Sequence, residues 1–207
     1  MANWTDDTAH EDYALDALLN GKGFPVKKHD IEIGRGRGMD SFDADRIAKF
    51  DNGAELWQGT YPPTGDTLRK LGFDVVVLAA EEYQPESSRF TGGVKVIHAP
   101  NDDAPISEGG DTSLALRVSA ETAQALRDGK KVLSTCAAGL NRSGLVSSFT
   151  LMRLFPEKTG DEIIDLIRDA RGGWAMSNGD FAKIVRKMQA RRQAAAKARR
   201  STRGSKK

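Results

Sequence analysis

The sequence predicts a single α/β domain in which a central, mostly parallel sheet is flanked by helices. Two observations carry this prediction. Short apolar runs of strand length, at residues 73–78, 94–97 and 131–133, alternate with longer segments of helical periodicity. The first run, Phe-Asp-Val-Val-Val-Leu, is nearly continuous in apolar residues, which is typical of a strand buried on both faces of a parallel sheet. Strands that alternate with helices indicate helices packed on the faces of one sheet.

Local signals bound each element. The predicted order is strand 56–59, helix 66–71, strand 73–78, strand 94–97, a helix that carries the apolar positions of 114–126, strand 131–133, helix 144–155, a helix that carries those of 163–167 and a last helix that carries those of 181–188. Gly72 and Gly129 are the glycine stops expected after the first two helices. Pro156 ends the third helix. Thr159 and Glu162 have the spacing of a capping box, and Asn178 can cap the last helix.

The chain divides into three parts by composition. Residues 51–190 carry the regular pattern and form the predicted domain, whereas residues 1–50 are assigned to an N-terminal extension. Residues 191–207 hold eight Lys and Arg side chains and no acid, which predicts a solvated, disordered tail. Such a block can also contact a polyanion such as RNA, DNA or an anionic membrane surface.

Composition disfavours a membrane protein and a disulfide-stabilised protein. Hydrophobic residues make up 39% and charged residues 29%, as in soluble globular proteins. No apolar run reaches the roughly 18 residues that a membrane span needs, and the acidic N-terminus lacks the order of a secretory signal. The chain has one cysteine, so it cannot form an internal disulfide and suits a reducing compartment, which predicts a cytoplasmic protein. Composition makes no prediction of an oligomeric state.

The single cysteine stands where a strand passes through a glycine-bearing loop into a helix. The segment reads Cys136-Ala137-Ala138-Gly139-Leu140-Asn141-Arg142-Ser143. A lone cysteine is more often a buried, inert side chain, so its neighbours carry the hypothesis. Backbone N–H groups of such a loop form an anion cradle, and the helix N-terminus adds positive potential. Arg142 offers a planar fork for two phosphate oxygens, and this field favours the thiolate of Cys136. A thiolate, an anion cradle and a planar arginine fork together suit covalent phosphoryl transfer.

The pattern Cys-x5-Arg-Ser, from Cys136 to Ser143, resembles the signature of the protein tyrosine phosphatase superfamily. The domain as a whole is similar to the dual-specificity branch, over residues 54–188. Four further segments resemble family elements in the right order: Leu56–Gly59 the opening strand, Phe73–Ala79 the next strand, Ala99–Pro105 the general-acid loop, and Asn178–Phe181 a late Asn-x-x-Phe element.

The resemblance implies a phosphatase that acts on phosphorylated protein or another phosphomonoester and needs no metal or other cofactor. Cys136 would attack phosphorus to form a cysteinyl-phosphate, while Arg142 would hold the equatorial oxygens. Asp103 would protonate the leaving oxygen, with Asp102 as the alternative acid. Ser143 would stabilise the thiolate when it leaves. The phosphate-binding loop would comprise Ala137, Ala138, Gly139, Leu140, Asn141 and Arg142.

Three features beside the signature carry further expectations. Thr135 occupies the position before the cysteine where the family usually has histidine, and its hydroxyl can still hydrogen-bond into the loop. Arg168 and Arg171 are predicted to lie at an exposed helix end with favourable dipole contacts, and a contact with phosphate or substrate is the alternative. The three histidines show no metal-ligand spacing.

Two other functions stay open. Residues 141–144, Asn-Arg-Ser-Gly, also resemble the loop of RNA 5′-triphosphatases of the same superfamily, and a basic tail would suit RNA. Those enzymes do not rely on an aspartic general acid, whereas this chain has Asp102 and Asp103. The second alternative is a phosphate-binding module without turnover, which the threonine at position 135 keeps open. A P-loop nucleotide-binding protein is excluded because no G-x4-G-K-[ST] occurs.

Overall fold

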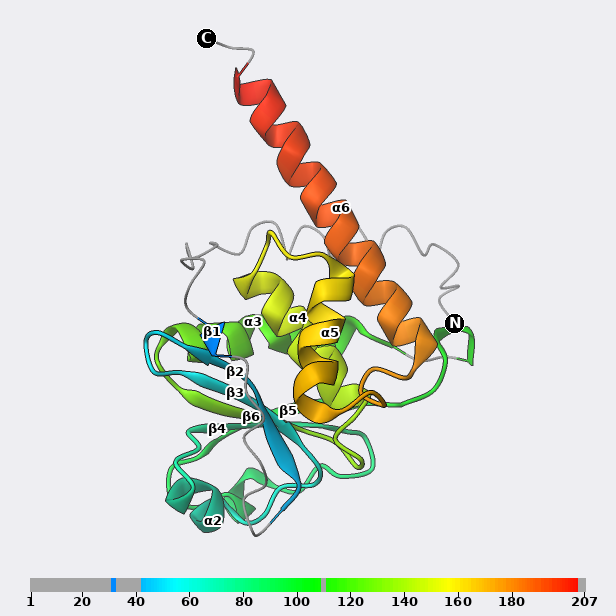
Figure 1. Cartoon of the computed structure of the whole chain (residues 1–207). Coiled ribbons are helices and arrows are strands. Elements are labelled where there is room, and N and C mark those ends of the chain that lie inside the picture. The colour runs from blue at the N-terminus through cyan, green and yellow to red at the C-terminus, as the bar shows by residue number, and fades with distance from the viewer. Residues whose placement is uncertain (1–30, 33–41, 109–110, 205–207) are drawn as a thin grey trace, which may run out of the picture.

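The six strands of the structure form one sheet with helices on both faces. The computed structural model describes residues 31–32, 42–108 and 111–204 (Figure 1). The elements in order are β1 (Ile31–Glu32), β2 (Ala44–Phe50), β3 (Glu55–Gly59), α2 (Gly65–Lys70), β4 (Val75–Ala80), η1 (Ser87–Arg89), β5 (Lys95–Asn101), η2 (Ile106–Glu108), α3 (Ser113–Arg127), β6 (Lys131–Thr135), α4 (Arg142–Leu154), α5 (Gly160–Arg171) and α6 (Gly179–Gly204).

The strand order is β1-β2-β3-β6-β4-β5. The four strands β3, β6, β4 and β5 pair in parallel, while β1 and β2 are antiparallel additions at one edge. Thr135 lies beside Gly59 in one neighbouring strand and beside Leu78 in the other. The carboxyl ends of three parallel strands therefore meet at the residue that precedes Cys136. The predicted fold class is confirmed.

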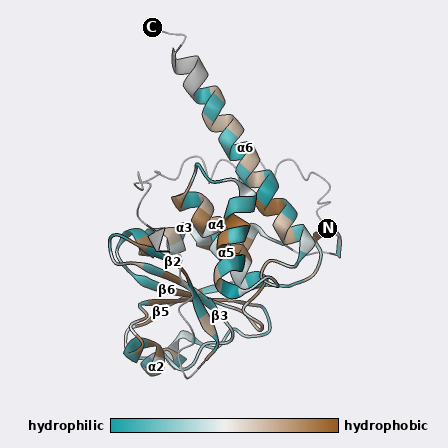
Figure 2. Ribbon diagram, in the orientation of Figure 1, coloured by the Kyte–Doolittle hydropathy of each residue, from teal (hydrophilic) through white to brown (hydrophobic). Residues whose placement is uncertain are grey.

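Two apolar layers hold the helices against the sheet. Helices α3, α4, α5 and the first half of α6 cover one face, and α2 lies on the other (Figure 1). Every residue of β4 is buried, as its continuous apolar run predicts, because β4 lies inside the sheet between two parallel neighbours. Every residue of α4 is buried as well. Brown, hydrophobic segments gather on α4, α5 and the first turns of α6 (Figure 2).

Two local predictions of helix starts are confirmed. The Thr159 side chain accepts a hydrogen bond from the Glu162 N–H over 3.2 Å, and the Glu162 carboxylate accepts from the Thr159 N–H over 2.7 Å. Asn178 Oδ1 accepts from the backbone N–H groups of Asp180 and Phe181 at the start of α6. Both caps satisfy N–H groups that the first turn of a helix leaves without partners.

The domain begins earlier than predicted. Residues 44–50, assigned to the N-terminal extension, form strand β2 inside the sheet. Their burial does not alternate, because a bulge between Arg46 and Ala48 shifts the register by one residue. A bulge breaks the period of two on which strand prediction depends, so the sequence signal was lost. The rest of the extension, residues 1–30 and 33–41, lies outside the described residues.

The predicted disordered tail also differs from the structure. Helix α6 continues through residues 191–204 and projects away from the body of the molecule (Figure 1). Four alanines at positions 194–196 and 198 are strong helix formers, and Lys and Arg are good ones. Helix propensity therefore outweighs the block of like charge. Residues 205–207 lie outside the described residues. No helix in the described ranges is both long and apolar enough to cross a membrane.

Candidate active site

Cys136 lies directly after β6, at the edge of the sheet where the parallel strands end. Residues 136–141 form the connection from β6 to α4, here termed the cysteine loop. The Cys136 N–H donates to Gly59 O over 3.2 Å, which ties the start of the loop to the end of β3. The side chain is 2% exposed, and its Sγ lies 3.3 Å from the Ser143 Oγ. The sulfur therefore faces the first turn of α4.

Three consecutive carbonyl oxygens of the cysteine loop are bound from outside. Gln58 Nε2 donates to Gly139 O over 3.0 Å and to Leu140 O over 3.3 Å. Arg171 donates from Nε to the same Gly139 O over 3.1 Å, and from Nη2 to Ala138 O over 3.4 Å. In a trans peptide the N–H points opposite to the C=O, so the N–H groups that follow these carbonyls point inward. Within the described ranges, no backbone N–H of residues 137–141 donates to another residue. The loop thus turns several unpaired N–H groups to the side opposite Gln58 and Arg171.

Gly139 gives the loop its shape. Its φ of +66° lies in the left-handed region, which side chains disfavour. A Cβ at this position would lie 2.5 Å from the carbonyl carbon of Gly59 and 2.8 Å from Arg171 Nη2. Only glycine allows the loop, the end of β3 and Arg171 to approach this closely.

Arg142 begins α4 and is 8% exposed. Its Nη2 donates to Glu82 Oε1 over 2.8 Å, and its Nη1 donates to Glu82 Oε2. These hydrogen bonds lower the pKa of Glu82 from 4.5 to about 2 and raise the pKa of Arg142. Arg142 Nε is buried and has no hydrogen-bond partner among the described residues. One edge of the guanidinium is therefore held by Glu82, while the Nε remains a donor for another group.

Asp103 lies beside the cysteine loop, in the segment that follows β5. Its Oδ2 accepts from Asn141 Nδ2 over 3.2 Å, and its Oδ1 accepts from Asn178 Nδ2 over 3.0 Å. A second contact holds the same segment, because the Ile106 N–H donates to Asp180 Oδ2 over 3.1 Å. We term residues 102–108 the acid loop. The structure brings Asp103 to the cysteine loop, whereas Asp102 is exposed and makes no side-chain hydrogen bond in the described part of the chain.

Two expectations beside the signature are wrong. The Thr135 hydroxyl donates to Val77 O over 2.9 Å, so it bonds into the sheet rather than into the cysteine loop. Arg171 does not lie at an exposed helix end, because its side chain is only 4% exposed and contacts the carboxylates of Asp43 and Asp45. Helix-end position alone gave no sign that the chain folds β2 against this end of α5.

Two residues that hold the site, Gln58 and Glu82, were not predicted as site residues. Gln58 is fully buried. A polar residue inside an apolar strand was the sequence signal that could have pointed to it. Glu82 follows the end of β4, where polar side chains in α/β folds face the ligand edge. Arg171 was singled out by its place before the glycine pair at 172–173, but nothing local showed that it bonds the loop carbonyls. Among the described residues, no cluster of His, Cys, Asp and Glu could hold a metal ion.

No protein-family model matches this sequence, and no curated protein sequence matches it. Solved structures do match. A mouse candidate dual specificity phosphatase complexed with zinc tungstate is 24% identical with a TM-score of 0.60, over 74% of this chain and 90% of that chain. Human DUSP28 is 21% identical with a TM-score of 0.57, over 72% and 95% of the two chains. A human tyrosine phosphatase-like serine/threonine/tyrosine-interacting protein is 18% identical with a TM-score of 0.56, over 71% and 95%.

These likenesses confirm the resemblance at the level of the fold. Each covers at least 90% of the matched chain, so the whole domain is shared and not one motif. The chain has the fold of the dual-specificity phosphatases.

Proposed function

We propose that this chain, which has the dual-specificity phosphatase fold, is a cysteine-dependent phosphatase that forms a cysteinyl-phosphate intermediate. The observation that carries the proposal is the arrangement around one loop with inward N–H groups: the Cys136 sulfur, the Arg142 guanidinium and the Asp103 carboxylate. Phosphorylated Tyr, Ser or Thr side chains of proteins are the substrates we propose, since one neighbour is described as a dual specificity phosphatase and another as a tyrosine phosphatase-like serine/threonine/tyrosine-interacting protein. Its lone thiol suits a reducing compartment such as the cytoplasm.

In the first step, Cys136 Sγ would attack phosphorus. The S–P bond forms while the P–O bond to the leaving group breaks, and Asp103 gives its proton to the leaving oxygen. The loop N–H groups and Arg142 stabilise the equatorial phosphoryl oxygens. Burial of Arg142 with its Nε uncommitted supports this role, since a buried donor is costly unless a ligand completes it.

In the second step, water would attack the phosphorus of the cysteinyl-phosphate. The new O–P bond forms as the S–P bond breaks, and the electron pair returns to sulfur as thiolate. Asp103, now a carboxylate, takes the proton from the water, and inorganic phosphate leaves. The Ser143 hydroxyl, 3.3 Å from Sγ, is placed to donate to the thiolate.

The proposal is tested with an aryl phosphate in the presence of EDTA. Wild type should release phosphate, and Cys136→Ser should lose turnover by about 10⁴-fold or more. Acid quench during turnover should leave phosphate on Cys136, detected by mass spectrometry. Thr135→Ser is the matched control, because serine can keep the hydrogen bond to Val77 O. Turnover that survives in Cys136→Ser would sink the mechanism.

A phosphate-binding module without turnover is the second candidate. It is favoured by one neighbour, whose name describes a phosphatase-like interacting protein, and by Thr135, which does not bond into the loop. Wild type that binds a phosphopeptide without hydrolysing it, at every pH from 5 to 8, would favour this function.

An RNA 5′-triphosphatase is disfavoured by the two hydrogen bonds that hold Asp103 at the loop. Faster release of γ-phosphate from triphosphate-ended RNA than of phosphate from a phosphopeptide would reverse this choice.

The projecting end of α6 supports a separate proposal of polyanion contact. Removal of residues 197–207 spares Arg192, which is buried and donates to Met152 O. This truncation should weaken polyanion binding and flatten its salt dependence, with aryl phosphate turnover unchanged.

A further inference from the structure

Arg171 is the last residue of α5 and the most heavily bonded side chain around the cysteine loop. Nη1 donates to Asp43 Oδ1 and to Asp45 Oδ2, each over 2.7 Å, and Nη2 donates to Asp43 Oδ2 over 2.6 Å. The other edge of the guanidinium reaches the loop, where Nε bonds Gly139 O and Nη2 bonds Ala138 O. One planar cation thus joins two carboxylates to two loop carbonyls.

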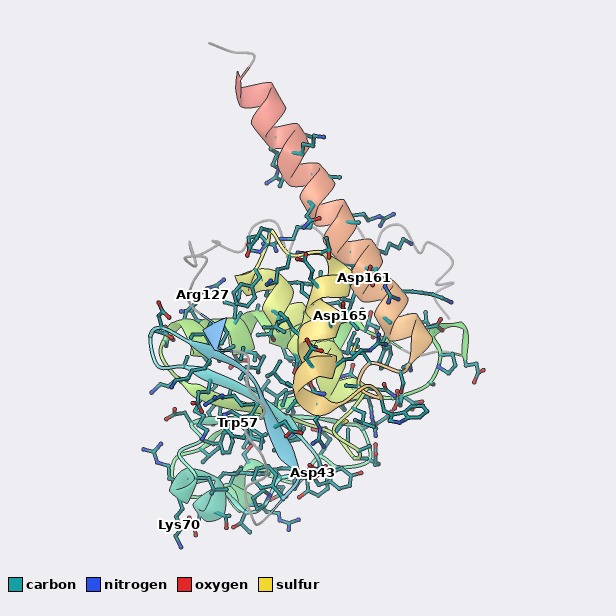
Figure 3. The ribbon with its side chains drawn as sticks, viewed as in Figure 1. Asp43, Trp57, Lys70, Arg127, Asp161 and Asp165 are labelled. Atoms are coloured by element: carbon teal, nitrogen blue, oxygen red, sulfur yellow. The ribbon has the colours of Figure 1, made fainter. Side chains whose placement is uncertain are left out.

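The two carboxylates come from the start of β2, far from α5 in sequence. Asp43 lies below the C-terminal end of α5, whereas Asp161 and Asp165 lie higher on that helix (Figure 3). The backbone of Asp43 is fixed in turn, because the Thr60 N–H donates to Asp43 O over 2.9 Å. The hydrogen bond from Arg171 lowers the pKa of Asp43, so this carboxylate stays charged at neutral pH.

Burial makes this arrangement a rigid one. A guanidinium that is 4% exposed is costly unless its charge is balanced and its N–H groups are bonded. Asp43 and Asp45 balance the charge on one side, which fixes the plane of the guanidinium and directs its remaining donors at the loop. Turning a loop peptide over would bring its N–H against these donors and would leave the guanidinium unsatisfied.

We propose that Arg171, held by Asp43 and Asp45, is a positioning residue that keeps the cysteine-loop carbonyls outward and so presents the following N–H groups to the phosphoryl oxygens. The inference rests on the proposed phosphatase function. It makes the start of β2 part of the active-site support, because Asp43, directly before the strand, and Asp45, inside it, hold the guanidinium. Lysine cannot replace arginine here, since one ammonium cannot span two carboxylates and two carbonyls in a plane.

The test measures binding of tungstate, a tetrahedral oxyanion, together with aryl phosphate kinetics. Arg171→Ala and Arg171→Lys should weaken tungstate binding by about 10- to 100-fold, the scale for misplaced catalytic groups. The value of kcat/KM should fall in parallel for good and poor leaving groups, because Asp103 is not disturbed. Arg153→Ala is the matched control: it removes another buried arginine, which bonds Ser119 Oγ and Leu116 O at the far end of α4. It should lower the melting temperature and leave tungstate affinity unchanged.

Asp43→Asn keeps the inference testable if the Arg171 variants do not fold. Asp43 is 67% exposed, so an amide is tolerated there, and tungstate binding should weaken by several-fold. Tungstate affinity within twofold of wild type in every folded Arg171 variant and in Asp43→Asn would overturn the inference. Failure of the proposed function looks different: wild type itself would then not turn over an aryl phosphate, whether or not it binds tungstate.

Discussion

The cysteine loop and the acid loop lie side by side but are held in different ways. The carbonyls of the cysteine loop are bound by Gln58, which is fully buried, and by Arg171, which is 4% exposed. The acid loop is held by Asn141 and Asn178 through exposed hydrogen bonds and by Asp180 through a part-buried one. Exposed hydrogen bonds contribute less, because water competes for both partners. We therefore expect oxyanion binding to depend on the buried side chains that hold the cysteine loop, and proton transfer to depend on the acid loop, which contacts the cysteine loop at Asn141.

Among the tests of this comparison, the largest effect is expected from Arg142→Lys, directly after the cysteine loop. A lysine loses the planar fork and the pairing with Glu82, so kcat/KM should fall by about 10³-fold. Steady-state kinetics with an aryl phosphate measure the loss. It should be equal for good and poor leaving groups, and a loss confined to poor leaving groups would break the comparison.

The next effect tests the acid loop with Asp103→Asn. An amide cannot give a proton, so kcat should fall by about 10²-fold for poor leaving groups and little for good ones. Tungstate affinity should not change. Asp102→Asn is the control, since Asp102 is exposed one position away. A larger effect at Asp102 than at Asp103 would reassign the acid.

A smaller effect is expected from Asn178→Asp. Aspartate can keep the cap of α6, so the melting temperature should stay near that of wild type. Its second oxygen would lie against Asp103 Oδ1, where the Asn178 amide now donates. Repulsion should displace the acid loop and lower kcat several-fold for poor leaving groups alone. Weaker tungstate binding in this variant would show that the two loops are not independent.

The smallest effect concerns Glu82, the exposed partner of Arg142. Its pKa is lowered from 4.5 to about 2 by the hydrogen bonds with Arg142. The pairing therefore stabilises the folded state fully above pH 4.5, and this contribution disappears as the pH falls towards 2. Glu82→Gln should be less stable than wild type at pH 6, and the difference should vanish near pH 2. Urea unfolding at the two pH values measures this. If the difference in stability between Glu82→Gln and wild type is the same at both pH values, the charge of Glu82 does not stabilise the protein through Arg142.

Sequence by itself determined the elements whose signals are local. The apolar run of β4 and the capping box at Thr159 involve neighbours along the chain, so they could be read without the fold. The same holds for the segment Cys136 to Ser143, whose residue types define the chemistry of a strand, loop and helix. Strand β2 escaped because its bulge breaks the alternation that a local pattern needs.

Only the tertiary structure decided which distant residues complete the site. Glu82 lies 60 positions from Arg142, and Asp43 lies 128 positions from Arg171. The direction of the loop carbonyls depends on Gln58 and Arg171, which reach the loop from β3 and α5. A short motif specifies which groups are present, because backbone preferences act over a few residues. Their orientation requires buried partners, and the packing of sheet and helices brings those partners together.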